Sequence, residues 1–440
     1  MINISKKESR KINVNLGLLL PMLFLSLIGI IALLSTVIQT DGTFGDLSIV
    51  TKQLIFLFFG FGIYFLLSMF NISIFREWQV GLVIYLITIV LLVLVLLFGP
   101  VVNNVQRWLV VAGVQIQPSE IAKFTVILTT ALVFSFKDRY NEWFLFFISL
   151  LLVLPIVILV YMQPSGSMSI LILLIWFLVA FTGLNNQLRN SVLLIIIASI
   201  TVAFFTSTIL NNWFYLLISL IGVILAIFSF YYRDSWRIFI ISAVFLSILV
   251  GIFSVVLYRD ILKDYQRDRI EVFLNPSQDT QNLGFNVNQA RIAIGSGQIF
   301  GKGFGNGTQS KRNFLPEHQT DFIFASFAEE FGLVGSLFLL IMYGIIIING
   351  LILSVNNVDN PFLLMLSIGI TMKILLEVFV NIGTNTGAIP ATGIPLPLVS
   401  AGGSITVMTL FSLGVIQSIM NNTKERRTKG KIIDNYDFIN

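Results

Sequence analysis

The feature that most constrains this chain is a succession of apolar runs, each about 20 residues long, along its 440 residues. At a rise of ~1.5 Å per residue, a helix of that length crosses the ~30 Å hydrocarbon core of a bilayer. Such runs must be helical, because lipid offers no partner for exposed backbone groups. With 56% hydrophobic and only 11% charged residues, the chain has too few polar side chains to cover this surface in water. The sequence therefore predicts an all-α, polytopic integral membrane protein.

About twelve runs are long enough to be spans. They cover residues 14–38, 53–71, 79–99, 118–136, 142–162, 167–184, 190–211, 213–231, 236–258, 321–350, 361–382 and 395–420. The first run is too long for a signal peptide and lacks a small-residue cleavage site, so we interpret it as an uncleaved span. The connection at Asn211 and Asn212 is so short that a re-entrant hairpin is the alternative there.

Basic residues are unevenly distributed over the connections, which predicts the orientation. With the N-terminus inside, the inner loops and tails hold Lys6, Lys7, Arg10, Lys11, Arg76, Lys137, Arg139, Arg189, Arg233, Arg237, Lys424, Arg426, Arg427, Lys429 and Lys431. The short outer loops hold only Lys52 and Arg107. We expect both termini in the cytoplasm, with residues 421–440 as a basic tail. Because these charges are explained as topology signals, no nucleic-acid partner is expected.

Three connections fall on the outer side, where long loops on a helical scaffold usually carry function. They are residues 259–320, residues 100–117, and a Gly- and Pro-rich stretch from Gly383 to Pro397. In the longest one, Asp279 follows Arg267 and Arg269. A carboxylate beside cations suits a general base that acts near an anionic substrate, although an ordinary solvated acid is the simpler interpretation.

The stretch GSGQIFGKGFGNGTQ superficially resembles a phosphate-binding loop. It fails the Walker pattern, because Gly303 follows Lys302 where Ser or Thr is required. Turn-rich packing is the simpler use of this loop, although Thr308 and Gln309 could donate hydrogen bonds to a ligand.

Several ionisable residues fall inside the predicted spans, where each needs a partner or water. They are Glu120 with Lys123, Glu329 with Glu330, and Lys373 with Glu377. Local ion pairs that only help a helix insert are the alternative to a functional role. The absence of cysteine and the single His318 exclude thiolate and multi-histidine metal centres.

Five strings together resemble the SEDS family of shape, elongation, division and sporulation proteins, the RodA and FtsW membrane glycosyltransferases. They are QRWLVVAGVQIQPSEIAKF, YQRDRIEVFLNPSQD, QARIAIGSGQIFGKGFGNGTQ, FLPEHQTDFIFASFAEEFGLVG and GIPLPLVSAGGS, in this order over nearly the whole chain. The GNGTQ and GIPLPLVS versions resemble RodA more than FtsW.

The resemblance implies a peptidoglycan glycosyltransferase that polymerises lipid II and releases undecaprenyl pyrophosphate. Asp279 matches the family's essential outer aspartate and is expected to act as general base on the acceptor hydroxyl, with inversion at the donor MurNAc carbon. Cationic candidates for the pyrophosphate are Arg107, Lys123, Arg267 and Arg269, and a divalent cation such as Mg²⁺ or Mn²⁺ could share this role, although the sequence shows no metal cage. Trp108 matches a family tryptophan that could stack on the substrate. Glu120, Glu317, Thr320, Asp321 and Ser400 match motif positions to which we assign only a site-shaping role.

The resemblance also implies a class B penicillin-binding protein as transpeptidase partner and the bacterial plasma membrane as location. The family commonly has ten spans, so residues 190–235 are expected to be an inserted pair. Departures from the family pattern put substrate positioning in doubt, and a paralogue of reduced activity is an alternative. They occur at Ser165, Thr280, Gln281, Asn282, Gln319 and Ala401.

Two other functions fit the same sequence. A transporter of lipid-linked precursors is suggested by the polar residues within spans, although no inverted repeat is evident. A non-catalytic scaffold that recruits the transpeptidase is the third interpretation. Whether the role is elongation, division or sporulation is left open by the residues.

Overall fold

The computed structural model describes residues 14–38, 43–101, 105–111, 113–209, 216–262, 264–274, 283–311 and 317–437. These residues are mainly helical, with one two-stranded hairpin, and they form two compact units. Unit 1 comprises Met1–Gly183 and Val272–Asn440, and unit 2 comprises Leu184–Glu271. Each unit is described by itself. The all-α membrane fold expected from the sequence is confirmed.

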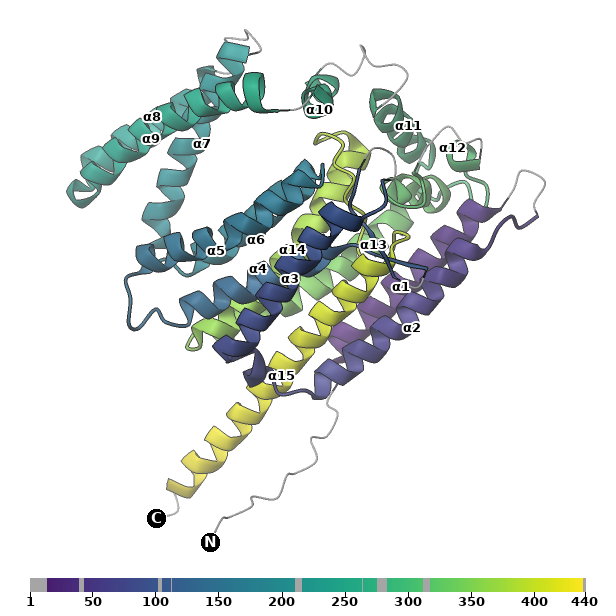
Figure 1. The fold of residues 1–440 in the computed structure, drawn as a ribbon, viewed down its shortest axis with the longest axis horizontal. Helices are drawn as coiled ribbons and strands as arrows, with labels where there is room; N and C mark the ends of the chain where they lie inside the picture. The colour runs from purple at the N-terminus through teal and green to yellow at the C-terminus, as the bar shows by residue number, and fades with distance from the viewer. Residues whose placement is uncertain are drawn as a thin grey trace. The chain divides into compact units, whose positions relative to one another are not determined.

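Unit 1 is a bundle in which α14 packs on α4, α6 and α13, while α15 packs along α2 (Figure 1). Its helices are α1 (Leu16–Val37), α2 (Ser48–Met69), η1 (Ile72–Arg76), α3 (Trp78–Phe98), α4 (Pro118–Phe134), α5 (Glu142–Met162), α6 (Gly166–Thr182), α11 (Leu283–Ser296), α12 (Thr308–Lys311), α13 (Ile323–Val355), α14 (Pro361–Thr386) and α15 (Gly403–Asp437). Strands β1 (Leu109–Val111) and β2 (Val114–Ile116) pair antiparallel just before α4.

Unit 2 is built around α7, which packs on both α8 and α9. Its elements are α7 (Gln187–Ile209), α8 (Leu216–Tyr232), η3 (Asp234–Trp236), α9 (Arg237–Val256), the π-helical turn η4 (Leu257–Ile261) and most of α10 (Asp264–Leu274). Close packing of α8 on α7 depends on Gly222, since a Cβ there would lie 2.1 Å from the hydroxyl oxygen of Ser199. The inserted pair expected at 190–235 corresponds to α7 and α8, and its status as an insertion stays a prediction.

Within the described residues, nine helices are long and apolar enough to cross a membrane. The other three expected spans are the 17-residue helices α4, α6 and α8. A helix of that length measures about 26 Å, slightly less than the hydrocarbon core. The helices thus follow the expected succession of runs, with boundaries shifted by several residues.

The last span is corrected at both ends, because α15 begins at Gly403 instead of residue 395 and continues to Asp437 instead of ending at residue 420. Helix α14 also continues to Thr386, so the loop expected from Gly383 to Pro397 starts later. The irregular segment that follows α14 lies inside the bundle, where Leu396 and Ser400 are fully buried. It passes so close to α1 that a Cβ on Gly29 would come within 2.6 Å of the Leu398 carbonyl oxygen. Irregular backbone is tolerated at membrane depth when protein covers it.

Helix α13 is interrupted at Gly332, whose backbone has φ 64° and ψ −161°. The segment 298–303 fills this interruption with four backbone hydrogen bonds of 2.9–3.1 Å. They run from Lys302 N to Glu329 O, Gly303 N to Glu330 O, Leu333 N to Gln298 O and Val334 N to Ile299 O. The Gly-rich stretch of the sequence therefore packs against the break in α13.

Replacing Gly332 with alanine should destabilise the protein by about 1–3 kcal/mol, because this backbone conformation is essentially restricted to glycine. The added Cβ would also lie 2.4 Å from the Gly301 nitrogen. Gly344→Ala is the matched control in the same helix, since a Cβ there meets no atom within 4 Å. Thermal unfolding in detergent measures both variants. Equal stability of the two would contradict this account of the break.

Candidate active site

The β1–β2 hairpin is tied to unit 1 at both ends. The Gln117 amide donates to the Ser404 hydroxyl at the start of α15, over 2.9 Å. The Arg107 guanidinium donates to the Pro164 carbonyl in the turn between α5 and α6. Arg107 and the half-buried Trp108 are thereby held at the end of the bundle where α4 begins. Ser165, which stands where the family usually has aspartate, directly follows the carbonyl that Arg107 contacts.

Below this hairpin, two expected local pairs join into one buried charge network. The Lys123 ammonium donates to Glu120 at 2.7 Å and to Glu377 of α14 at 2.5 Å. The Lys373 ammonium lies 3.4 Å from the second oxygen of Glu377. All four side chains are at most 1% exposed. Two cations and two carboxylates balance, which is how charge is tolerated in an apolar interior.

A second polar cluster connects α13, α14 and the irregular segment before α15. The Ser400 hydroxyl donates to the Thr320 carbonyl at 2.6 Å and accepts from the Leu396 amide at 2.8 Å. The side-chain amides of Asn381 and Asn385 both donate to the Asp321 carbonyl at 2.9 Å. Thr320 and Ser400 are thus in direct contact, and their hydrogen bonds hold the backbone of this segment; the site-shaping role assigned to them stays a prediction.

Glu317 lies near this cluster in sequence and on its exposed side. Its carboxylate accepts from the Thr320 hydroxyl at 2.8 Å, and its backbone has a positive φ of 55°. The neighbouring Gln319 carbonyl accepts from the Ala401 amide at 2.9 Å. Gln319 and Ala401, two positions that depart from the family pattern, therefore contact each other through backbone atoms. This contact does not depend on which side chain stands at either position.

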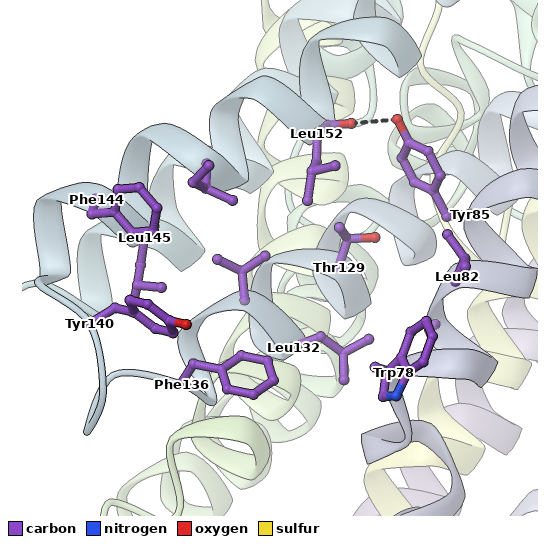
Figure 2. A pocket seen from close by; sticks show the side chains of 13 residues that line it. Trp78, Leu82, Tyr85, Thr129, Leu132, Phe136, Tyr140, Phe144, Leu145 and Leu152 are labelled. Atoms are coloured by element: carbon purple, nitrogen blue, oxygen red, sulfur yellow. Dashed lines mark hydrogen bonds between the residues drawn. The ribbon is translucent and has the colours of Figure 1, made fainter.

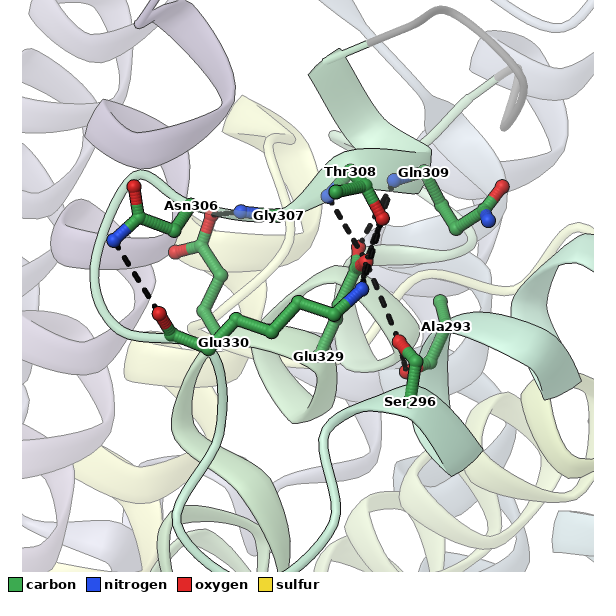
Figure 3. Close-up of polar contacts among 9 residues, drawn as sticks. Ala293, Ser296, Asn306, Gly307, Thr308, Gln309, Glu329 and Glu330 are labelled. Atoms are coloured by element: carbon green, nitrogen blue, oxygen red, sulfur yellow. Dashed lines mark hydrogen bonds and ion pairs between the residues drawn. The ribbon is translucent and has the colours of Figure 1, made fainter.

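The third cluster surrounds Glu329, whose carboxylate is fully buried (Figure 3). One oxygen accepts from the Lys302 ammonium at 2.6 Å and from the Thr308 hydroxyl and amide at 2.7 and 2.9 Å. The Gln309 amide donates to the other oxygen at 3.2 Å. Thr308 and Gln309, considered as ligand donors from the sequence, hold an internal carboxylate in this structure.

The adjacent Glu330 side chain connects the same loop to α1. Its carboxylate accepts from the Ser35 hydroxyl of α1. It also accepts from the Gly307 amide at 3.3 Å, as Figure 3 shows. The two consecutive glutamates therefore bind the Gly-rich loop from α13. Consecutive loop amides of Thr308 and Gln309 donate to the Glu329 carboxylate, so a protein carboxylate is the anion that this loop binds.

The remaining predicted residues belong to unit 2 or lie outside the described residues. Asp279 lies outside the described residues, together with Thr280, Gln281 and Asn282. Arg267 and Arg269 are on α10 in unit 2, where Arg267 donates to the Arg259 carbonyl at 2.6 Å. In the described part of the chain, no three acidic or histidine side chains gather as a metal site. The divalent cation therefore stays a prediction.

Sequence reasoning missed the partners that lie far along the chain. Ser35, Asn381 and Asn385 carry no motif signal, although the last two are polar residues spaced i, i+4 in an apolar run. That spacing could have indicated a polar helix face. The contact between Lys123 and Glu377 spans 254 positions and has no local signal.

Taken together, the fold and the clusters define a helical multi-pass membrane protein with a polar site at one end of its bundle. The family model described as a cell cycle protein, for FtsW, RodA and SpoVE, matches residues 16–216 and 214–425. This chain belongs to that family.

Among curated relatives, the peptidoglycan glycosyltransferase MrdB of Escherichia coli (strain K12) is 36% identical over 341 residues, which cover 78% of each chain. The peptidoglycan glycosyltransferase RodA of Treponema pallidum is 28% identical, over 91% of this chain and 96% of its own. The probable peptidoglycan glycosyltransferase FtsW of Bacillus subtilis is 29% identical, over 86% and 83%.

Solved structures share the fold. A chain from a study of how a peptidoglycan synthase complex coordinates polymerization and crosslinking superposes with a TM-score of 0.65 at 24% identity, over 93% of this chain and 98% of that one. The rod shape determining protein RodA of Thermus thermophilus gives a TM-score of 0.57 at 22% identity, over 92% and 97%.

Glu377→Gln should destabilise the protein by about 3–5 kcal/mol, because it leaves Lys373 and one bond of Lys123 without a carboxylate. Lys373→Met combined with Glu377→Gln removes one charge of each sign and should recover most of this loss. Thermal unfolding of the single and double variants measures the difference. A double variant no more stable than Glu377→Gln would contradict the charge balance.

Glu329→Gln should loosen the Gly-rich loop, because hydrogen bonds to a charged group contribute about 1.5–3 kcal/mol each. We expect hydrogen exchange at the Thr308 and Gln309 amides to accelerate at least about tenfold. Glu77→Gln, at an exposed position of the same unit, is the control. Unchanged exchange in Glu329→Gln would show that other contacts hold the loop.

Proposed function

We propose that this chain polymerises lipid II into glycan strands at the outer face of the bacterial plasma membrane. The chain is a multi-pass membrane peptidoglycan glycosyltransferase of cell-wall synthesis, the class of its curated relatives. The observation that carries the proposal is the buried network of Glu120, Lys123, Glu377 and Lys373, which places paired charges beneath the hairpin that bears Arg107 and Trp108. Burying charged side chains at membrane depth costs free energy, so their presence indicates a functional role.

The proposed reaction forms one glycosidic bond and breaks one bond to pyrophosphate. The 4-hydroxyl of the acceptor GlcNAc attacks the anomeric carbon of the donor MurNAc, and that centre inverts. Asp279 accepts the hydroxyl proton as general base. Undecaprenyl pyrophosphate leaves with the electron pair of the broken bond.

Developing charge on the pyrophosphate must be met by cations. Arg107 is the best placed candidate among the described residues, since it is half-buried on the hairpin. Lys123 is fully buried and shared between two carboxylates, so it supports the site electrostatically and would have to exchange a partner to contact substrate. Arg267 and Arg269 precede Asp279 by 12 and 10 positions in the sequence and complete the proposed set. The aromatic ring of Trp108 suits stacking against a sugar.

A class B penicillin-binding protein is the proposed partner. Polymerised strands need crosslinking, and the peptidoglycan synthase complex that shares this fold is described as coordinating the two activities. The large apolar faces that unit 1 exposes on its helices suit contact with lipid or with a partner's membrane helix.

Asp279→Ala should abolish strand synthesis from labelled lipid II by the purified protein with its transpeptidase partner. Removing an essential general base typically costs 10²–10⁴-fold or more in rate. Asp268→Ala, at an exposed acid of the same loop, is the control and should keep activity. Full polymerisation by Asp279→Ala would overturn the proposal. Lipid II translocation that survives Asp279→Ala, without any polymer from the wild type, would favour a transporter.

A further inference from the structure

We propose that a groove between α3, α4 and α5 binds one acyl chain of a zwitterionic phospholipid with a primary ammonium headgroup, such as phosphatidylethanolamine. The groove lies within unit 1, at the opposite end of α3 from the hairpin that carries Arg107 and Trp108. The proposal uses no residue of the candidate active site. The lipid site can therefore be tested independently of the glycosyltransferase function.

The groove has a volume of about 380 Å³ and a lining that is almost entirely hydrocarbon (Figure 2). Trp78, Leu82 and Tyr85 of α3 form one wall, and Leu132 of α4 and Phe136 just beyond it form part of the floor. Sites that enclose a small ligand commonly measure roughly 300–1,000 Å³ and are mostly apolar. A hydrocarbon chain is the ligand that such a lining accepts without leaving polar groups unpaired.

One end of the groove is fixed by a hydrogen bond between its two walls. The Tyr85 hydroxyl of α3 donates to the Leu152 carbonyl of α5 over 2.9 Å (Figure 2). At the other end, Trp78 starts α3 and Tyr140 precedes α5. The groove therefore runs from the middle of the helices to the start of α3 and the connection between α4 and α5, where we place the lipid headgroup.

The charged residues that neighbour this second end in the sequence are the basis for the headgroup assignment. Six charged residues lie within two positions of a lining residue, namely Arg76, Glu77, Lys137, Asp138, Arg139 and Glu142. Three cations and three acids give no net charge, so the mouth has no electrostatic preference for an anionic lipid. Guanidinium and ammonium groups bind a phosphate, while carboxylates accept hydrogen bonds from a primary ammonium. A choline headgroup satisfies only the first of these contacts.

Aromatic residues border the mouth as they border membrane interfaces in general. Trp78 is 61% exposed and Phe144 is 52% exposed, although both line the groove. Amphipathic and aromatic rings at the headgroup level anchor lipid and protein to each other. Exposed rings here leave the groove accessible from the bilayer.

Native mass spectrometry of the detergent-purified full chain, with added phosphatidylethanolamine, tests the groove. Leu82→Trp fills it, and Ile87→Trp places the same side chain at a similarly exposed position of α3 outside the lining. We expect the wild type and Ile87→Trp to retain one lipid and Leu82→Trp to lose it at least fivefold. Equal retention by the two tryptophan variants would overturn the site.

The headgroup is tested with variants that leave the helices unchanged. Lys137→Gln with Arg139→Gln should weaken phosphatidylethanolamine retention. Arg233→Gln with Arg237→Gln removes the same charge from unit 2, next to η3 and at the start of α9, and should not weaken it. Wild-type protein should retain phosphatidylethanolamine at least threefold better than phosphatidylglycerol or phosphatidylcholine. Equal retention of all three, or preferential retention of a polyprenyl phosphate, would overturn the assignment of the occupant.

Discussion

The structure depends on one ammonium group that is shared between two helices. Lys123 of α4 is bound by Glu120 of its own helix and by Glu377 of α14, and all three side chains are buried. An isolated charge at this depth would be expelled or neutralised, so the network exists only if α4 and α14 stay together. Because α14 also packs on α6 and α13, the charge network fixes the centre of the bundle and, with it, the position of the hairpin above α4.

A second constraint works through backbone geometry. The break of α13 at Gly332 frees carbonyls that the Gly-rich loop caps, and Glu329 then anchors the side chains and amides of that loop. Helix α11, which precedes this loop, is thereby packed against α13. The segment with Asp279 immediately precedes α11 in sequence. Three residues, 280–282, separate Asp279 from the start of α11 in the sequence.

The features that could be predicted from the sequence are those that a pattern within a single helix encodes. Run length gave the helices, and the spacing of Glu120 with Lys123 and of Lys373 with Glu377 gave two pairs, because both signals lie within one helix. The two pairs form one network only because α4 packs on α14, and no local sequence pattern encodes that packing. The expected start of the last span at residue 395 was wrong, because the buried irregular segment before α15 is also apolar. Pro395 and Pro397 indicated that this stretch is not helical. The role of Asp279 depends on the family resemblance alone.

The proposed function requires Asp279, the proposed general base, to face the outside of the cell, on the same side of the membrane as Arg107 and Trp108. The chain contains no cysteine, so Asp279→Cys introduces a single thiol. Labelling of intact cells with a membrane-impermeant maleimide should modify this thiol, while Lys137→Cys should react only after the membrane is opened. Protection of Cys at position 279 in intact cells, with labelling after lysis, would contradict the account.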